Sequence, residues 1–138
     1  MALVVPQDSL VDCLSAWISS VLNSCKIRLF VSNITPGSST TLASLLAAEA
    51  TFSGYSPVLL TTWSAPTIGG SGGADTLCTQ PSFTGTALGG TGNLYGYFLT
   101  NSGGTVYYGA ERFASAPLSF AQNTPFNFDV KYTFISQS

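Results

Sequence analysis

The sequence predicts a mainly β fold: an antiparallel β-sandwich or barrel-like domain, with one N-terminal α-helix packed on it. Three observations support this fold class. Residues 94–113 hold two aromatic-rich runs around the polar, glycine-containing spacer 101–104, a pattern typical of a β-hairpin. Residues 126–135 alternate apolar with polar side chains, as a half-buried strand does. The clearest helical periodicity lies in residues 9–23.

The length of the chain fits a single domain covering residues 1–138. A chain of this size buries roughly two-thirds of the surface that it exposes when unfolded. Within the domain we expect an N-terminal arm at residues 1–8, the helix at residues 9–23, and glycine-rich variable loops at residues 64–92.

An apolar arm opens the chain, where Leu3, Val4 and Val5 precede Pro6. Three roles fit this arm: a first strand, a packed tail, or a segment that docks on a neighbouring chain. The opening residues have no basic region and no long apolar run, so a signal peptide is not expected. No apolar run approaches the ~20 residues of a membrane helix either.

The predicted helix repeats apolar side chains at steps of three and four residues. These side chains belong to Leu10, Leu14, Trp17, Ile18 and Val21. Asp8 or Ser9 is expected to cap its N-terminus, and Asn23-Ser24 to end it. The simplest interpretation packs this helix on the sheet. The alternative places Trp17 partly against another subunit.

The first predicted strand is residues 26–32, where Lys26 and Arg28 share one face. We interpret that face as solvated rather than as a ligand site. Residues 41–50 suit a short helix, although their hydroxyl groups also suit a loop. Residues 58–63 predict another strand.

Glycine-rich segments separate the following strands. Residues 65–73 are expected to form a flexible loop, and the apolar residues Ile68 and Leu77 around it are candidate contacts with a partner. Residues 76–84 predict an edge strand, because Pro81 has no N–H to donate to a central ladder.

A second glycine-rich connection is predicted at residues 85–93, and a loop or weak strand at residues 114–124. The hairpin between them has two largely apolar faces, so we place it in the middle of a sheet or between two layers. The closing strand is expected to turn one set of side chains inward, namely Phe126, Phe128, Val130, Tyr132 and Phe134.

The residue types give little support to catalysis. The chain has no histidine, the side chain most often used for acid–base work at neutral pH. Its six acidic residues are scattered, and its glycine runs lack the lysine of a phosphate-binding loop. Glu111 and Arg112 suggest an ion pair across strands rather than a catalytic pair. We therefore expect no enzyme, no catalytic or metal-binding residue and no cofactor.

Charge and cysteine content point to assembly inside a reducing compartment. Four basic and six acidic residues give a net charge of −2, which provides no footprint for nucleic acid and little repulsion between copies. Cys13, Cys25 and Cys78 are an odd number without close spacing, so we interpret them as small, reduced apolar residues. Partners are expected to be other proteins and copies of the chain itself.

Several stretches resemble a group of small structural proteins of tailed-bacteriophage virions. They are MALVVP at the start, KIRLFVSNITP, EATFSGY, the hairpin YGYFLT with VYYGAERF, and the closing FDVKYTF. The resemblance covers most of the chain and departs from it at residues 66–92.

The resemblance implies a capsid decoration or cement protein. Such a protein is made in the host cytoplasm and binds the major capsid lattice on the outer surface of the phage head. We take Leu3, Val4, Val5, Trp17, Ile68 and Leu77 as its candidate interface. The alternative is a tail- or fibre-associated module that binds a receptor or glycan through exposed Trp63, Tyr107 or Tyr108. A small hydrolase is the third hypothesis.

Overall fold

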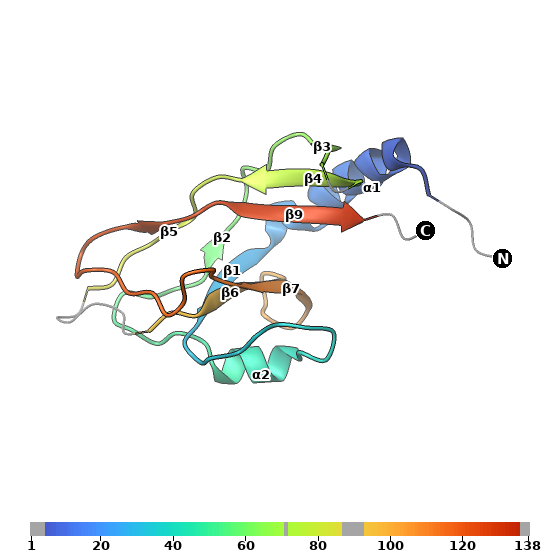
Figure 1. The fold of residues 1–138 in the computed structure, drawn as a ribbon. Helices are drawn as coiled ribbons and strands as arrows, with labels where there is room; N and C mark the ends of the chain where they lie inside the picture. Colours follow the sequence, from blue (N-terminus) through green and yellow to red (C-terminus); the bar gives the residue numbers. More distant parts are fainter. Residues whose placement is uncertain (1–4, 71, 87–92, 136–138) are drawn as a thin grey trace. The chain divides into compact units, whose positions relative to one another are not determined.

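The computed structural model describes residues 5–70, 72–86 and 93–135. Its helices are α1 (Gln7–Ser20), the 3-10 helix η1 (Leu22–Ser24) and α2 (Leu42–Ala47). Its strands are β1 (Lys26–Phe30), β2 (Val58–Leu59), β3 (Thr67–Ile68), β4 (Gly73–Cys78), β5 (Ser82–Phe83), β6 (Gly96–Thr100), β7 (Tyr107–Arg112), β8 (Phe126–Asn127) and β9 (Val130–Ile135). All strand pairs among the described residues are antiparallel, which confirms the mainly β fold with an N-terminal helix (Figure 1).

The described strands form three open sheets, with the orders β2-β1-β6-β7, β3-β4-β9 and β5-β8. None of these orders closes on itself, so the barrel-like alternative is not found. The chain divides into two compact units. Unit 1 contains Met1–Ser24, Leu60–Pro81 and Phe128–Ser138, and unit 2 contains Cys25–Leu59 and Ser82–Asn127. That the two units form one domain stays a prediction.

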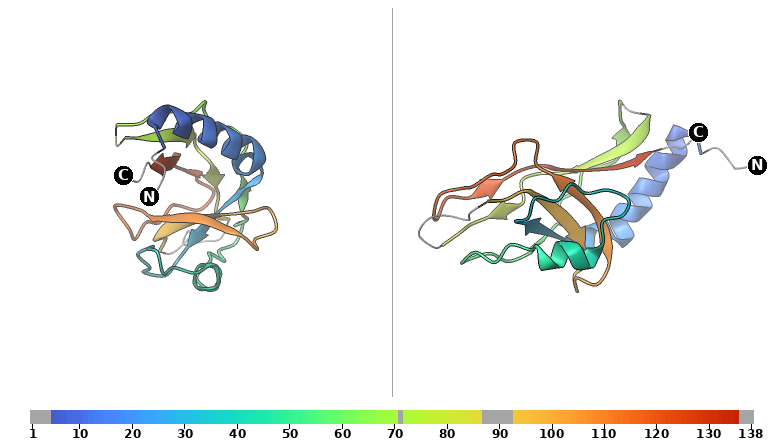
Figure 2. Two further views of the ribbon diagram at one scale, coloured as in Figure 1. Left: turned by 90° about the vertical axis from the view of Figure 1, so that its right-hand side faces the viewer. Right: turned by 60° about the horizontal axis from the view of Figure 1, so that its bottom comes forward.

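In unit 1 the helix α1 packs on one face of the β3-β4-β9 sheet (Figure 2). Leu10, Leu14 and Ile18 are buried on the inner side of the helix. The Trp17 ring lies 6.3 Å from the ring of Phe134 on β9. The predicted amphipathic helix and its packing on a sheet are therefore confirmed.

The ends of α1 differ from the prediction. Pro6 is the N-cap residue, no side chain caps the helix, and Asp8 and Ser9 lie inside the first turn. Proline is compatible with the extended backbone of this position (φ −69°, ψ 156°), but its side chain has no oxygen to accept an N–H of the first turn. The charge of Asp8 still lies near the positive end of the helix dipole. At the C-terminal end α1 ends at Ser20, and the separate 3-10 helix η1 begins at Leu22.

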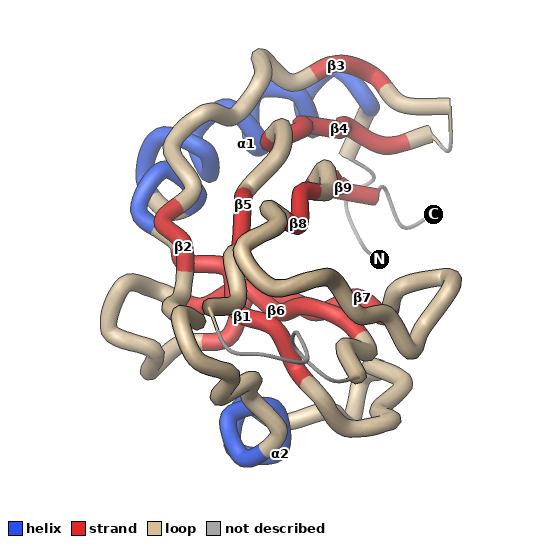
Figure 3. Tube along the Cα trace, turned by 90° about the vertical axis from the view of Figure 1, so that its left-hand side faces the viewer, coloured by secondary structure: helices blue, strands red, loops and turns tan. Residues whose placement is uncertain are grey.

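The closing strand keeps its predicted alternation but is divided between two sheets. Its first part is β8, which pairs with β5 in unit 2 (Figure 3). Its second part is β9, where Val130, Tyr132 and Phe134 pair with alternate residues of β4. Those β4 residues are buried on the side of α1, so the inward face of the closing strand is confirmed over β9.

The edge strand predicted at residues 76–84 is instead two strands, the end of β4 and the two-residue β5, and only β5 lies at an edge, in its two-stranded sheet with β8. β4 is the central strand of its sheet, and it ends at Cys78, before Pro81. Because the proline lies beyond the ladder, it places no limit on the position of β4. The preceding segment is also more regular than predicted, since β3 lies inside the expected loop.

The hairpin of unit 2 is formed as predicted, by β6 and β7. Asn101 closes its turn, since its Oδ1 accepts the N–H groups of Thr105 and Val106. All five residues of β6 are buried: β1 and β7 pair with its two edges, and its faces are covered by packing such as that of Phe98 on Leu45 and of Tyr97 on Phe113. The central position is therefore right for β6 and wrong for β7, which lies at the end of the sheet.

Two apolar clusters support the sheet of unit 2. The short helix at α2 is formed, with Thr41 as its N-cap, and it buries Leu45 and Ala48 against Phe30 and Phe98. A second cluster is a chain of ring contacts of 5.2–5.9 Å between centroids. Its members are Tyr97, Phe113, Phe126, Phe120, Phe52, Tyr55 and Phe83.

Candidate functional site

The ionisable groups of unit 2 are used mainly within the fold. Arg28 Nη1 donates to both carboxylate oxygens of Glu49 at 3.0 Å, and its Nε donates to Thr100 Oγ1 at 3.1 Å. The Tyr55 hydroxyl donates to Glu49 Oε1 at 2.8 Å and accepts the N–H of Leu29. Burial, together with the hydrogen bond to Glu49, raises the pKa of Tyr55.

This network corrects the interpretation of Arg28 as part of a solvated face. Its side chain is only 14% exposed. Glu49, two residues after α2, forms an antiparallel backbone bridge with Phe30 of β1, and its carboxylate covers the Arg28 side chain. The hairpin turn covers it from the other side, where Gly104 leaves no room for a side chain next to the guanidinium group. Arg28 is therefore a structural residue.

A second ion pair lies on the outer face of the sheet in unit 1. Asp75 Oδ2 accepts from Lys131 Nζ at 2.8 Å, and Asp75 Oδ1 accepts from Thr133 Oγ1 at 2.7 Å. These hydrogen bonds, that of Lys131 first, hold the pKa of Asp75 below its usual value. Gly69 makes room for the carboxylate, since a Cβ at that position would lie 2.1 Å from Asp75 Oδ2.

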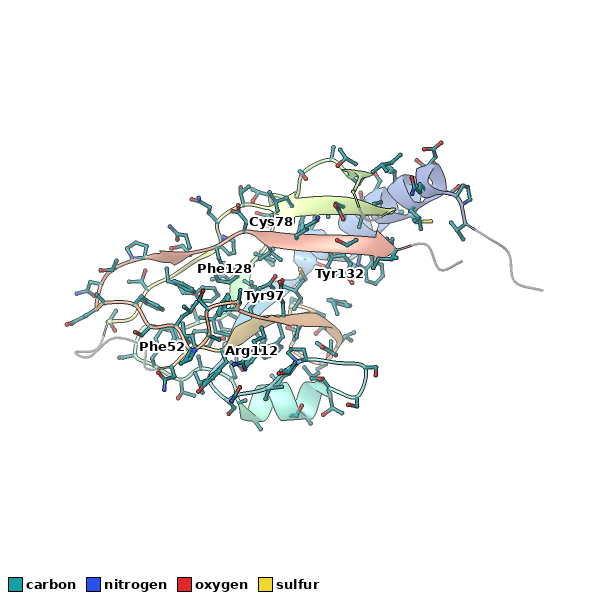
Figure 4. The ribbon with its side chains drawn as sticks, viewed as in Figure 1. Phe52, Cys78, Tyr97, Arg112, Phe128 and Tyr132 are labelled. Carbon is teal, nitrogen blue, oxygen red and sulfur yellow. The ribbon has the colours of Figure 1, made fainter. Side chains whose placement is uncertain are left out.

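Glu111 and Arg112 do not form the predicted ion pair, because the structure gives each another partner. Glu111 Oε2 accepts a hydrogen bond of 2.5 Å from the hydroxyl of Tyr97. Arg112 donates to Asn33 Oδ1, and its guanidinium carbon lies 5.2 Å from the centre of the Tyr95 ring. Figure 4 shows the side chains of Tyr97 and Arg112 on neighbouring strands.

Among the residues that the structure describes, no group of three or more Cys, Asp or Glu side chains is placed to hold a metal ion. No described helix is long and apolar enough to cross a membrane. Cys25 and Cys78 are buried, as expected of small apolar residues, whereas Cys13 is exposed because it lies off the apolar stripe of α1.

The aromatic residues of the glycan-binding alternative are not exposed. Trp63, Tyr107 and Tyr108 are all half-buried. Trp63 donates its indole N–H to the carbonyl of Leu22 at 3.0 Å, which uses the polar group that a sugar would need. Tyr107 packs against the cluster around Phe98.

The candidate interface residues separate into different environments. Leu3 and Val4 lie outside the described residues. Trp17 contacts Phe134 in its own unit, and its contact with another subunit stays a prediction. Leu77 is half-buried in β4 and lies in a strand rather than in a loop.

Two candidates, Val5 and Ile68, lie exposed at one end of unit 1. The start of α1, the turn between β3 and β4, and the end of β9 all lie at this end (Figure 1). Val5 is 36% exposed and Ile68 is 51% exposed. Ile135, at the last position of β9, is 63% exposed there. We call Val5, Ile68 and Ile135 the end surface.

The end surface presents apolar groups on both faces of the sheet. Ile68 pairs with Ala74, and Ile135 pairs with the neighbouring Gly73. Because successive residues of a strand point to opposite faces, Ile68 and Ile135 project from opposite sides. Leu77 shares the face of Ile135 but lies near the other end of β4, where it pairs with Lys131, so it is not part of this surface.

Sequence reasoning missed Ile135 although a signal was present. Along the closing strand the outward positions are polar, and Ile135 alone breaks that rule. This break in the polar face makes Ile135 a candidate contact position.

Comparisons of the chain with protein-family models, with curated proteins and with solved structures each found no match. The resemblance to tailed-phage virion proteins therefore rests on the stretches of sequence quoted above.

Proposed function

We propose that this chain is a structural protein of a bacteriophage virion that decorates and cements the head. It binds the lattice of the major capsid protein on the outer surface of the head. The end surface of Val5, Ile68 and Ile135 carries this proposal, since these are large apolar side chains exposed together at one end of a unit.

The placement of the end surface favours insertion of this end of unit 1 into a recess over its contact with one flat surface of a partner. Its apolar groups project from both faces of a thin sheet, so one flat partner would cover only part of them. A recess between neighbouring capsid subunits covers both faces at once. A protein held in such a recess adds contacts that must break before the subunits separate.

The energy of attachment comes mainly from burial of apolar area. Completely burying a Val or Ile side chain contributes about 1.5–3 kcal/mol, and these three are already partly covered, so each contributes less. One end surface is therefore a modest contact. Repetition over a lattice makes it effective, since binding to the assembled state stabilises that state by mass action.

The charge distribution supports the same mode of binding. Only 7% of the residues are charged, and Arg28 and Asp75 already have partners inside the fold. Contacts made by apolar groups and backbone hydrogen bonds are screened little by salt.

The test is co-sedimentation of the purified full-length chain with phage heads that lack it. We expect binding that persists at high salt. Replacing two residues together, Ile68→Asp and Ile135→Asp, is expected to weaken binding at least tenfold, which corresponds to ~1.4 kcal/mol. Both positions are exposed, so the fold is expected to remain intact.

Leu59→Asp is the matched control, because Leu59 is 49% exposed but belongs to unit 2. It is expected to bind as the unchanged chain does. Release of the chain by moderate salt alone, or equal binding by the double variant and the control, contradicts the proposal.

A further inference from the structure

We draw no further inference here: the strongest candidate, the cluster of half-buried aromatic rings in unit 2 that includes Phe52, Phe120 and Phe126, carries no proposal because nothing in the structure shows what covers it.

Discussion

Gly96→Ala is expected to destabilise unit 2 by at least the upper end of the ~1–3 kcal/mol that overpacking a core costs. A Cβ at this position would lie 2.2 Å from the carbonyl oxygen of Glu111 and 2.4 Å from the ring of Phe30. Neither can retreat easily, since one belongs to the paired backbone of β7 and the other is completely buried. Denaturant unfolding measured by far-UV circular dichroism gives the change in stability.

Gly37→Ala is the matched control within the same unit. A Cβ at Gly37 has nothing within 4 Å, so its stability is expected to change by less than ~0.5 kcal/mol. Equal stability of the two variants would show that the close approach of β6, β7 and Phe30 is not as described.

Glu49→Gln is expected to cost about 2–3 kcal/mol, somewhat below the ~3–5 kcal/mol for a completely buried ion pair. The change leaves the Arg28 charge, whose side chain is 14% exposed, without a carboxylate. It also weakens the hydrogen bond that the Tyr55 hydroxyl donates to residue 49, because an amide oxygen replaces a carboxylate oxygen as the acceptor. The measurement is the free energy of unfolding in a denaturant series.

A double variant separates the cost of an unpaired charge from the value of the pair. Arg28→Met with Glu49→Leu removes both charges, and it is expected to recover part of the stability lost in Glu49→Gln. Lys131→Met removes the other ion pair, in which the lysine side chain is 58% exposed, and is expected to cost less than ~1 kcal/mol. Equal losses for Lys131→Met and Glu49→Gln would refute this ranking.

Local patterns in the sequence were sufficient for much of the fold. The hairpin follows from aromatic runs around a turn that Asn101 closes through its own side chain. The helix follows from the spacing of Leu10, Leu14 and Ile18, which are its buried residues. Both signals act over a few residues, where periodicity and turn chemistry determine the structure.

The errors concern contacts between distant residues. Arg28 alternates with apolar residues, as an exposed side chain would, but Glu49 meets it from 21 positions away. Whether a strand lies at the centre or the edge of a sheet depends on its neighbours in space. For that reason β4 was expected at an edge and β7 at a centre.

The end surface shows the same limit. Val5 and Ile68 were candidates because each is an apolar residue in a predicted arm or loop. Ile135 joins them only once three segments have folded together. Leu77 has similar character, yet the register of β4 with β9 pairs it with Lys131, four residues before Ile135 and away from this end of the sheet. Pairing register, which the sequence does not encode locally, decides which residues form one surface.

A cryo-electron microscopy map of the phage particle tests the central claim most directly. We expect density for this chain on the outer surface of the head, with the Ile68 and Ile135 end inserted between capsid subunits. Density confined to the tail, or particles that do not contain the chain, would contradict the proposed function.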